Sequence, residues 1–220
     1  MNARGLKDAA DDDRIRAIFR ATLAMGAGVA FVIPDLDRYE ALCLDWYLGP
    51  GRDDAAVLET ADGRVGGYAL VCTSPDAHRR WTRRHAARFA VMVVAGFARG
   101  RYRGEAARFY RFRMHDGWSL RTRPAAVTGL GHAHVNLVPA LRAGRAGRVL
   151  AAHIDDRVSH AGLPGWFGEI NAVSGHRAAA LERLGGTVVH RAPNRTMSEL
   201  TGLRVDRLTV VRSLGIDAVA

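Results

Sequence analysis

The feature that most constrains this chain is a regular alternation of strand-like and helix-like segments in its second half. Strand-like segments alternate polar and apolar residues, helix-like segments carry apolar residues at helical spacing, and glycine or proline separates them. Strands separated by helices form a sheet with helices on its faces and some parallel pairing, so the pattern predicts an α/β fold. The expected elements are strands at 132–138, 166–170, 187–191 and 207–213 and helices at 148–160 and 174–184.

The first half of the chain predicts helices and one hairpin. Residues 11–25 have apolar residues at helical spacing, with Asp11–Asp13 as the expected N-terminal caps. A second helix is expected at Asp35–Tyr47. Strands at Ala55–Thr60 and Val65–Cys72 surround an Asp-Gly pair, which is a strong hairpin signal.

Residues 76–114 mix arginines with aromatic side chains and predict helices with a loop near Gly100–Gly104. Such a mixture can bind nucleic acid through stacking and charge. More often it marks amphipathic helices whose aromatic side chains face the core and whose arginines are solvated. We favour this second interpretation and expect a helical, basic and aromatic insertion around residues 75–120.

The net charge of +10 comes almost entirely from arginine, since Lys7 is the only lysine. Arginine-rich surfaces suit anionic partners such as phosphates, carboxylates or nucleic acid, although a solvated surface explains the charge equally well. The two cysteines are too few for a disulfide framework, and the N-terminus is unlike a signal peptide. The apolar stretches are too short or interrupted to span a bilayer. We therefore expect a cytoplasmic protein without a membrane partner.

The loop at 140–147, between the strand ending at Pro139 and the next helix, combines glycine with arginine. Small residues let main-chain N–H groups approach an anion, and a helix N-terminus adds partial positive charge. Flanking arginines add charge-assisted hydrogen bonds. The loop therefore predicts a phosphate or diphosphate site, with an ordinary strand–helix turn as the alternative.

Several motifs occur in a fixed order around this loop. His132, His134 and Asn136 begin a strand that ends Leu-Val-Pro, Arg142 and Gly147 bracket the glycine-containing loop, Gly-Leu-Pro-Gly follows at 162–165, and Leu-Gly at 184–185. Together they resemble the cofactor-binding core of the GNAT acetyltransferase superfamily. The resemblance is to a bacterial subgroup whose motifs read H-L-H-(I/V)-(D/N)-L-L-P, Q/R-G-x-G-x-G, G-V-P-G and N-x-x-A-x-x-F-Y-x-x-L-G-F. It covers residues 132–190 closely and the preceding part of the chain more loosely.

This resemblance implies one domain over residues 1–220. Its fold would be GNAT-like, with a mixed, V-splayed central sheet flanked by helices in three α/β/α layers. Acetyl-CoA, or another acyl-CoA, would be the cosubstrate, and no metal is expected. The pantetheine would pair with the strand edge at Leu137 and Val138. The diphosphate would bind main-chain amides of the loop and helix start, namely Arg142, Ala143, Gly144, Arg145, Ala146, Gly147 and Arg148.

The resemblance also implies N-acyl transfer to a small amine by direct attack on the thioester, without a covalent enzyme intermediate. His134 and Glu169 are the candidate general bases, because both would lie on the splayed strands. A buried structural histidine and an exposed strand residue are the respective alternatives. Two histidines at the spacing of 132 and 134 could bind zinc, but no third ligand is evident. Ser174 could replace the missing proton donor, because the motif tyrosine falls on Leu181.

Two departures from the motif leave a second function open. Arg145 replaces the first glycine of the G-x-G pair, and Leu181 cannot donate a proton. A catalytically impaired CoA-binding or regulatory domain is therefore the alternative to an enzyme. A nucleic-acid binder would rest on charge alone, and we do not expect one. A monomer or a homodimer is expected.

Overall fold

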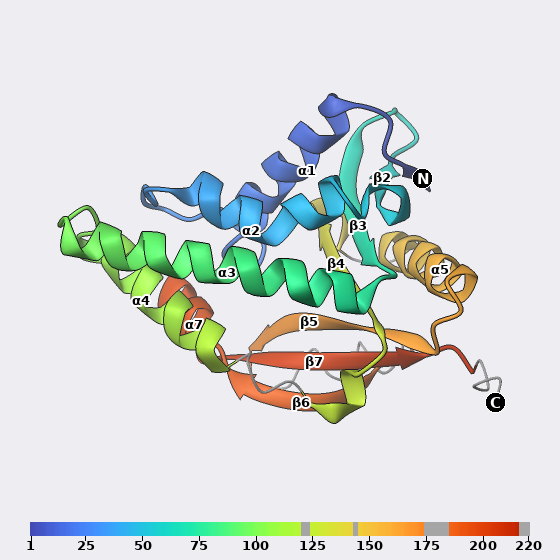
Figure 1. Cartoon of the computed structure of the whole chain (residues 1–220). Coiled ribbons are helices and arrows are strands. Elements are labelled where there is room, and N and C mark those ends of the chain that lie inside the picture. The colour runs from blue at the N-terminus through green and yellow to red at the C-terminus, as the bar shows by residue number, and fades with distance from the viewer. Residues whose placement is uncertain (120–123, 143–144, 174–184, 216–220) are drawn as a thin grey trace.

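The computed structural model describes residues 1–119, 124–142, 145–173 and 185–215 (Figure 1). The strands within these ranges form one mixed sheet in the order β1-β2-β3-β4-β5-β7-β6, which confirms the predicted α/β fold. The strands are β1 Asn2–Gly5, β2 Ala56–Glu59, β3 Val65–Cys72, β4 Gly131–Leu137, β5 Gly165–Val173, β6 Thr187–Pro193 and β7 Val205–Ser213. The helices are α1 Ala9–Thr22, α2 Leu36–Leu48, α3 Pro75–Ala98, α4 Gly104–Ser119, α5 Arg145–His160 and α7 Arg195–Thr201, with 3-10 turns η1 Arg52–Asp54, η2 Ala125–Val127 and η3 Pro139–Leu141.

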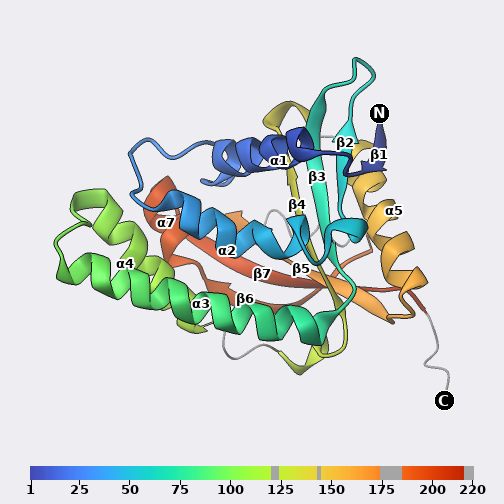
Figure 2. The same ribbon diagram turned by 45° about the horizontal axis from the view of Figure 1, so that its top comes forward.

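The sheet divides into two arms between β4 and β5. These strands run parallel but pair only at their beginnings, where Gly131 faces Trp166 and His132 faces Phe167. Beyond that point they diverge (Figure 2). We call β1 to β4 the first arm and β5, β7 and β6 the second arm. The expected V-shaped splay of the sheet is therefore present.

The first arm is covered by helices on both faces, because its strands alternate their side chains between two apolar clusters. Leu70 packs with Ile15 of α1 and Leu44 of α2 on one face. The next residue, Val71, packs with α5 on the other face, where Leu150, Ile154 and Val158 recur at helical spacing. This gives the predicted α/β/α layers.

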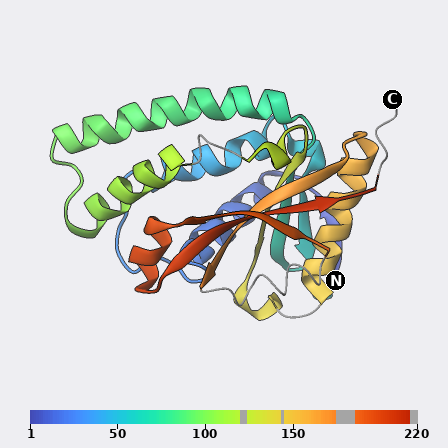
Figure 3. The same cartoon turned by 90° about the horizontal axis from the view of Figure 1, so that it is seen from below.

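The segment at 75–119 forms a pair of helices, α3 and α4, that run together along one side of the molecule (Figure 3). Its aromatic side chains are mostly turned inward: Tyr102, Phe109 and Tyr110 are buried, while Trp118 is exposed. The arginines of α3 at positions 79, 80, 83, 84 and 88 are exposed. This is the packing that the amphipathic interpretation predicts.

Helix α5 is tied to both arms by polar contacts. Its Asp155 accepts hydrogen bonds from Arg212 of β7 at 2.9 and 2.6 Å and from the indole of Trp166 at 2.8 Å. Its Arg157 donates to the carboxylate of Asp54 in η1, just before β2, at 3.0 and 2.6 Å. The helix therefore bridges the first and second arms.

The predicted start of the first helix, with Asp11–Asp13 as its caps, was wrong. Asp8 is its N-cap and accepts hydrogen bonds from the N–H groups of Ala10 and Asp11 at 3.0 and 3.2 Å. The expected cap, Asp11, instead lies buried in the first turn, where Arg4 hydrogen-bonds its carboxylate. This contact is the main reason that the pKa of Asp11 is lowered. Four aspartates precede the apolar pattern, and the pattern cannot tell which one caps.

Other boundaries also differ from the prediction. Helix α5 begins at Arg145 rather than at residue 148, and β5 is longer than expected. Strand β1 and helix α7, four and seven residues long, were not predicted. The helix expected at 174–184 lies outside the described residues. Within the described ranges, no helix combines the length and apolarity needed to cross a bilayer.

Candidate functional site

The split between the arms leaves one edge of β4 without a strand partner. The N–H of Val138 donates to the carbonyl of Gly66 at 2.9 Å. Since hydrogen-bonded residues alternate along an antiparallel strand, the main-chain groups of Val135 and Leu137 point away from β3 and into the split. Leu137 therefore lies on the edge expected for pantetheine, whereas the N–H of Val138 is used within the sheet.

The first turn of α5 follows this edge after the short turn η3. Arg145, Ala146 and Gly147 occupy positions where helix N–H groups have no carbonyl partner within the helix and carry partial positive charge. Arg145 and Arg148 are exposed. A Cβ added at Gly147 would meet no described atom within 4 Å. The turn thus offers main-chain N–H donors and two exposed guanidinium groups that form no ion pair with a described residue. Ala143 and Gly144 lie outside the described residues.

Arg142 has a different environment from the rest of the predicted loop. Its N–H donates to the carbonyl of Pro139 at 3.2 Å. Its guanidinium donates to the carbonyls of Leu137 at 3.1 Å and Met25 at 2.9 Å. Arg142 therefore links the end of β4 to the segment between α1 and α2.

The two histidines of β4 face the helices α1 and α2 but differ in their contacts. The imidazole of His132 is hydrogen-bonded to the Tyr47 hydroxyl, stacks on His78 and contacts the ring of Phe167 in a tilted arrangement. His134 meets the rings of Phe19 and Tyr68 edge-on, at centroid distances of 6.2 and 5.6 Å. His132 is thus the structural histidine.

The ring nitrogens of His134 have no hydrogen-bond partner in the described part of the chain. Burial lowers the pKa of His134 to about 4, because a cation is poorly solvated among these rings. The imidazole is therefore neutral at neutral pH, and one ring nitrogen can accept a hydrogen bond. No group of three His, Cys, Asp or Glu side chains among the described residues is placed to hold a metal ion.

Glu169 lies on the other side of the split, on β5. It pairs with Thr209 of β7 and lies on the same strand face as Phe167. The ring centroid of Phe167 is 4.8 Å from that of His132. Side chains two residues apart lie on the same face of a strand. Glu169 and His134 therefore point to the same face of the sheet, the one that α1 and α2 cover. Glu169 is partly buried rather than an exposed strand residue. Ser174, the third predicted catalytic residue, lies outside the described residues.

Sequence reasoning missed two arginines near Glu169. Arg207 of β7 is only 8% exposed, and Arg113 of α4 is partly buried with its guanidinium carbon 5.0 Å from the ring centroid of Tyr39. The signal for Arg207 was present, because the alternation of β7 places it on the inward face with Val205 and Thr209. No signal in the sequence pointed to Arg113 among the many arginines of its segment.

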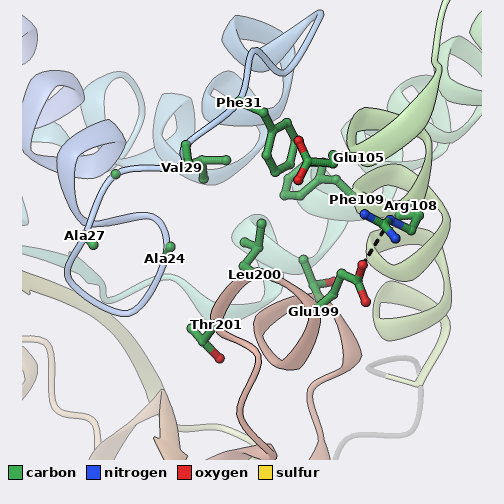
Figure 4. Close-up of a pocket in the computed structure, with 13 residues that line it drawn as sticks. Ala24, Ala27, Val29, Phe31, Glu105, Arg108, Phe109, Glu199, Leu200 and Thr201 are labelled. Atoms are coloured by element: carbon green, nitrogen blue, oxygen red, sulfur yellow. Dashed lines mark ion pairs between the residues drawn. The ribbon is translucent and has the colours of Figure 1, made fainter.

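A pocket of about 320 Å³ opens on the side of the sheet that α1 and α2 cover. It lies between the segment that connects α1 to α2, helix α4 and helix α7 (Figure 4). Phe31, Phe109 and Leu200 supply apolar walls, and an ion pair of 3.0 Å joins Arg108 to Glu199 at its rim. Arg142 ties the α1–α2 segment to the end of β4, and α7 leads into β7. The pocket therefore lies toward the open end of the split. Its lining residues are Ala24, Ala27–Phe31, Glu105, Arg108, Phe109, Thr196 and Glu199–Thr201.

No family model matches the sequence, and no curated protein sequence matches it. Solved structures do match over nearly the whole chain. A GCN5-related N-acetyltransferase from Kribbella flavida is 17% identical, with 97% of each chain covered and a TM-score of 0.55. A GNAT superfamily phosphinothricin acetyltransferase from Sinorhizobium meliloti, in complex with acetyl-CoA, is 19% identical, with 100% of this chain and 91% of that chain covered and a TM-score of 0.56.

A ribosomal-protein-alanine N-acetyltransferase from Brucella melitensis gives the same picture. It is 16% identical, with 97% of this chain and 100% of that chain covered and a TM-score of 0.54. The strand order, the split between β4 and β5 and the similarity to these solved structures all point to the same fold. The chain has the fold of the GNAT acetyltransferases.

Proposed function

We propose that the protein is an acetyl-CoA-dependent N-acyltransferase that acts on a small amine. The observation that carries this proposal is the unpaired edge of β4 at Val135 and Leu137, followed directly by the free N–H groups at the start of α5. An extended amide chain can add to such an edge as a further strand would. A diphosphate suits the helix start beside Arg145 and Arg148. The acetyl-CoA complex of the Sinorhizobium meliloti neighbour supports the proposal.

The chain's own residues suit direct transfer to an amine. When bound, acetyl-CoA supplies the acyl group as an activated thioester. The N–H groups of Val135 and Leu137 are fixed donors that can stabilise negative charge on a carbonyl oxygen in the split. The attacking nitrogen forms a bond to the carbonyl carbon, the C–S bond breaks, and the nitrogen loses one proton.

We assign the transfer of that proton to His134 and Glu169. The neutral imidazole of His134 accepts a hydrogen bond from the amine and orients its lone pair. Because the pKa of His134 is about 4, the ring holds a proton only briefly and passes it to water or to Glu169. Ser174 remains our candidate for protonating the departing thiolate.

One observation favours the alternative, a CoA-binding regulatory domain. The guanidinium of Arg142 donates hydrogen bonds to the carbonyl oxygens of Leu137 and Met25. This carbonyl is one of the acceptors on the edge of β4. A chain that keeps this contact could bind CoA without completing the transfer.

We treat residues 1–220 as one domain in which α3 and α4 build the acceptor side, and we place it in the cytoplasm. Calorimetric titration with acetyl-CoA, followed by thiol release with a panel of amines, tests the function. Micromolar binding with amine-dependent thiol release supports the enzyme. Binding without release supports the regulatory domain, and absence of binding contradicts both.

Two variants and one control sharpen this test. Arg148→Glu should weaken acetyl-CoA binding by about tenfold or more, because it replaces a charge-assisted donor with a repelling anion. Arg83→Glu makes the same charge change on the exposed face of α3 and should leave binding unchanged. His134→Gln should lower kcat by about 10²-fold or more while acetyl-CoA binding stays within about twofold. If His134→Gln turns over at the parent rate, His134 does not handle the proton.

A further inference from the structure

The guanidinium groups of Arg113 and Arg207 have no hydrogen bond or ion pair with any described residue. This is unusual, because Arg207 is more than nine-tenths buried and each guanidinium carries five N–H donors. The guanidinium of Arg113 lies over the ring face of Tyr39. Such a contact satisfies the charge in part but leaves the donors in the guanidinium plane available.

The nearby carboxylates do not neutralise the two arginines. Asp116, which is 1% exposed, accepts hydrogen bonds from the N–H groups of Arg195 and Thr196 at 3.2 and 2.9 Å and from the Thr196 hydroxyl at 2.6 Å. Its oxygens are thus committed to the start of α7. Glu169 acts on both guanidinium groups electrostatically but is beyond ion-pair distance.

This arrangement leaves hydrogen-bond donors available at a largely enclosed position. A mostly buried cation is less well hydrated than one at the surface, and native structures usually give such a group a hydrogen-bonding partner. Burial lowers the pKa of Arg207, and the charge of Arg113 lowers it further, against the opposing influence of Glu169. A bound anion would supply the missing acceptors and offset the repulsion between the two arginines.

The two arginines lie on elements that border the pocket and the split: Arg113 is on α4, which lines the pocket, and Arg207 is on β7 of the second arm. Phe109 lines the pocket (Figure 4). Arg113 follows one turn along α4 on the same face, since both side chains contact the ring of Tyr39. Thr196 also lines the pocket and is bonded to Asp116 in the next turn of α4. On the sheet, Arg207 is two residues from Thr209, the partner of Glu169.

We propose that Arg113 and Arg207 bind the carboxylate of the acceptor, so that the substrate is a primary amine that also carries a carboxylate, as a free amino acid does. The inference rests on the proposed function and deepens it. The planar guanidinium forks suit bidentate binding of a carboxylate. Glu169 then faces the ammonium end, near His134.

The test is calorimetric binding of the common amino acids and of their C-terminal amides, measured with and without saturating CoA. At least one amino acid should bind about ten- to hundredfold more tightly than its amide, because charged hydrogen bonds to the arginines are lost in the amide. Arg207→Gln and Arg113→Gln should each reduce this acid-to-amide ratio by about tenfold. Arg207→Lys, which keeps the charge without the fork, should retain part of it and covers the case in which Arg207→Gln does not fold.

Arg111→Gln is the matched control, since Arg111 lies on the same helix but is exposed and does not line the pocket. It should leave the ratio unchanged. Equal binding of acids and amides, binding of neither, or an unchanged ratio in Arg113→Gln and Arg207→Gln would overturn the proposal. A preference for succinyl-CoA over acetyl-CoA that Arg207→Gln abolishes would also overturn it, because the arginines would then read the acyl group. Titration of acetyl-CoA into the same variants shows separately whether the proposed function fails.

Discussion

The unusual environment of His134 makes the stability of the protein depend on pH in a way that one substitution should remove. The pKa of His134 falls from its ordinary value of 6.5 to about 4 on folding, because burial disfavours the cation. Between these values the unfolded chain binds a proton that the folded chain does not. The free energy of unfolding therefore decreases as the pH falls through this range, and the loss is complete below pH 4.

The size of the effect follows from the same shift. One pKa unit corresponds to about 1.4 kcal/mol, so His134 alone should remove about 2 kcal/mol of stability between pH 7.5 and pH 5. Urea unfolding at these two pH values measures this. His134→Gln cannot titrate, so its loss of stability over this interval should be smaller than that of the parent protein by about 2 kcal/mol.

Leu70→Ala is the control for destabilisation without titration. Leu70 pairs with His134 across β3 and β4 and is fully buried. The substitution should lower the free energy of unfolding by about 2–5 kcal/mol at both pH values, leaving the pH dependence parallel to the parent. An NMR titration of the His134 ring gives the pKa directly. A value near 6.5, or a His134→Gln curve parallel to the parent, would refute the reasoning.

Two further predictions concern stability. Asp116→Ala should cost about 3 kcal/mol in urea unfolding, because it leaves buried donors at the start of α7 unsatisfied, whereas Asp76→Ala on the exposed start of α3 should cost less than about 0.5 kcal/mol; equal effects would contradict the assigned role. Gly165→Ala should lower the melting temperature by several degrees, because its Cβ would lie 2.3 Å from the carbonyl oxygen of Arg212. Gly147→Ala, with open space around its Cβ, should leave the melting temperature unchanged or raise it, and a larger loss there than at Gly165 would show that the close approach does not govern stability.

Much of the fold could be predicted because local signals and tertiary packing agree. The Asp62-Gly63 turn sets the β2–β3 hairpin, and Gly63 adopts the positive φ of 77° that such a turn requires. Strand β4 and helix α5 show clean periodicity because each has one face on an apolar cluster. Strand β1 is too short for a periodic pattern, and it is held mainly by pairing with β2.

The candidate site was only partly predictable for a physical reason. Leu137, His134 and Glu169 lie on strands whose alternation is visible in the sequence. Arg113 and Arg207 are far apart in the chain, and the packing of α4 against α7, which in turn contacts β7, brings their elements together. Nothing local distinguishes a buried, unpaired arginine from a solvated one, and this chain has many of the latter.

The two-pair junction between β4 and β5 has a mechanical consequence. Main-chain hydrogen bonds across so short a junction cannot fix the angle between two half-sheets. Helix α5 contacts Asp54 beside the first arm and Arg212 of the second arm, and these contacts hold the two arms at their angle. The helix that holds the two arms at their angle is thus the same helix whose first turn we propose as the diphosphate site. A change in either of these contacts would therefore alter the spacing of the split.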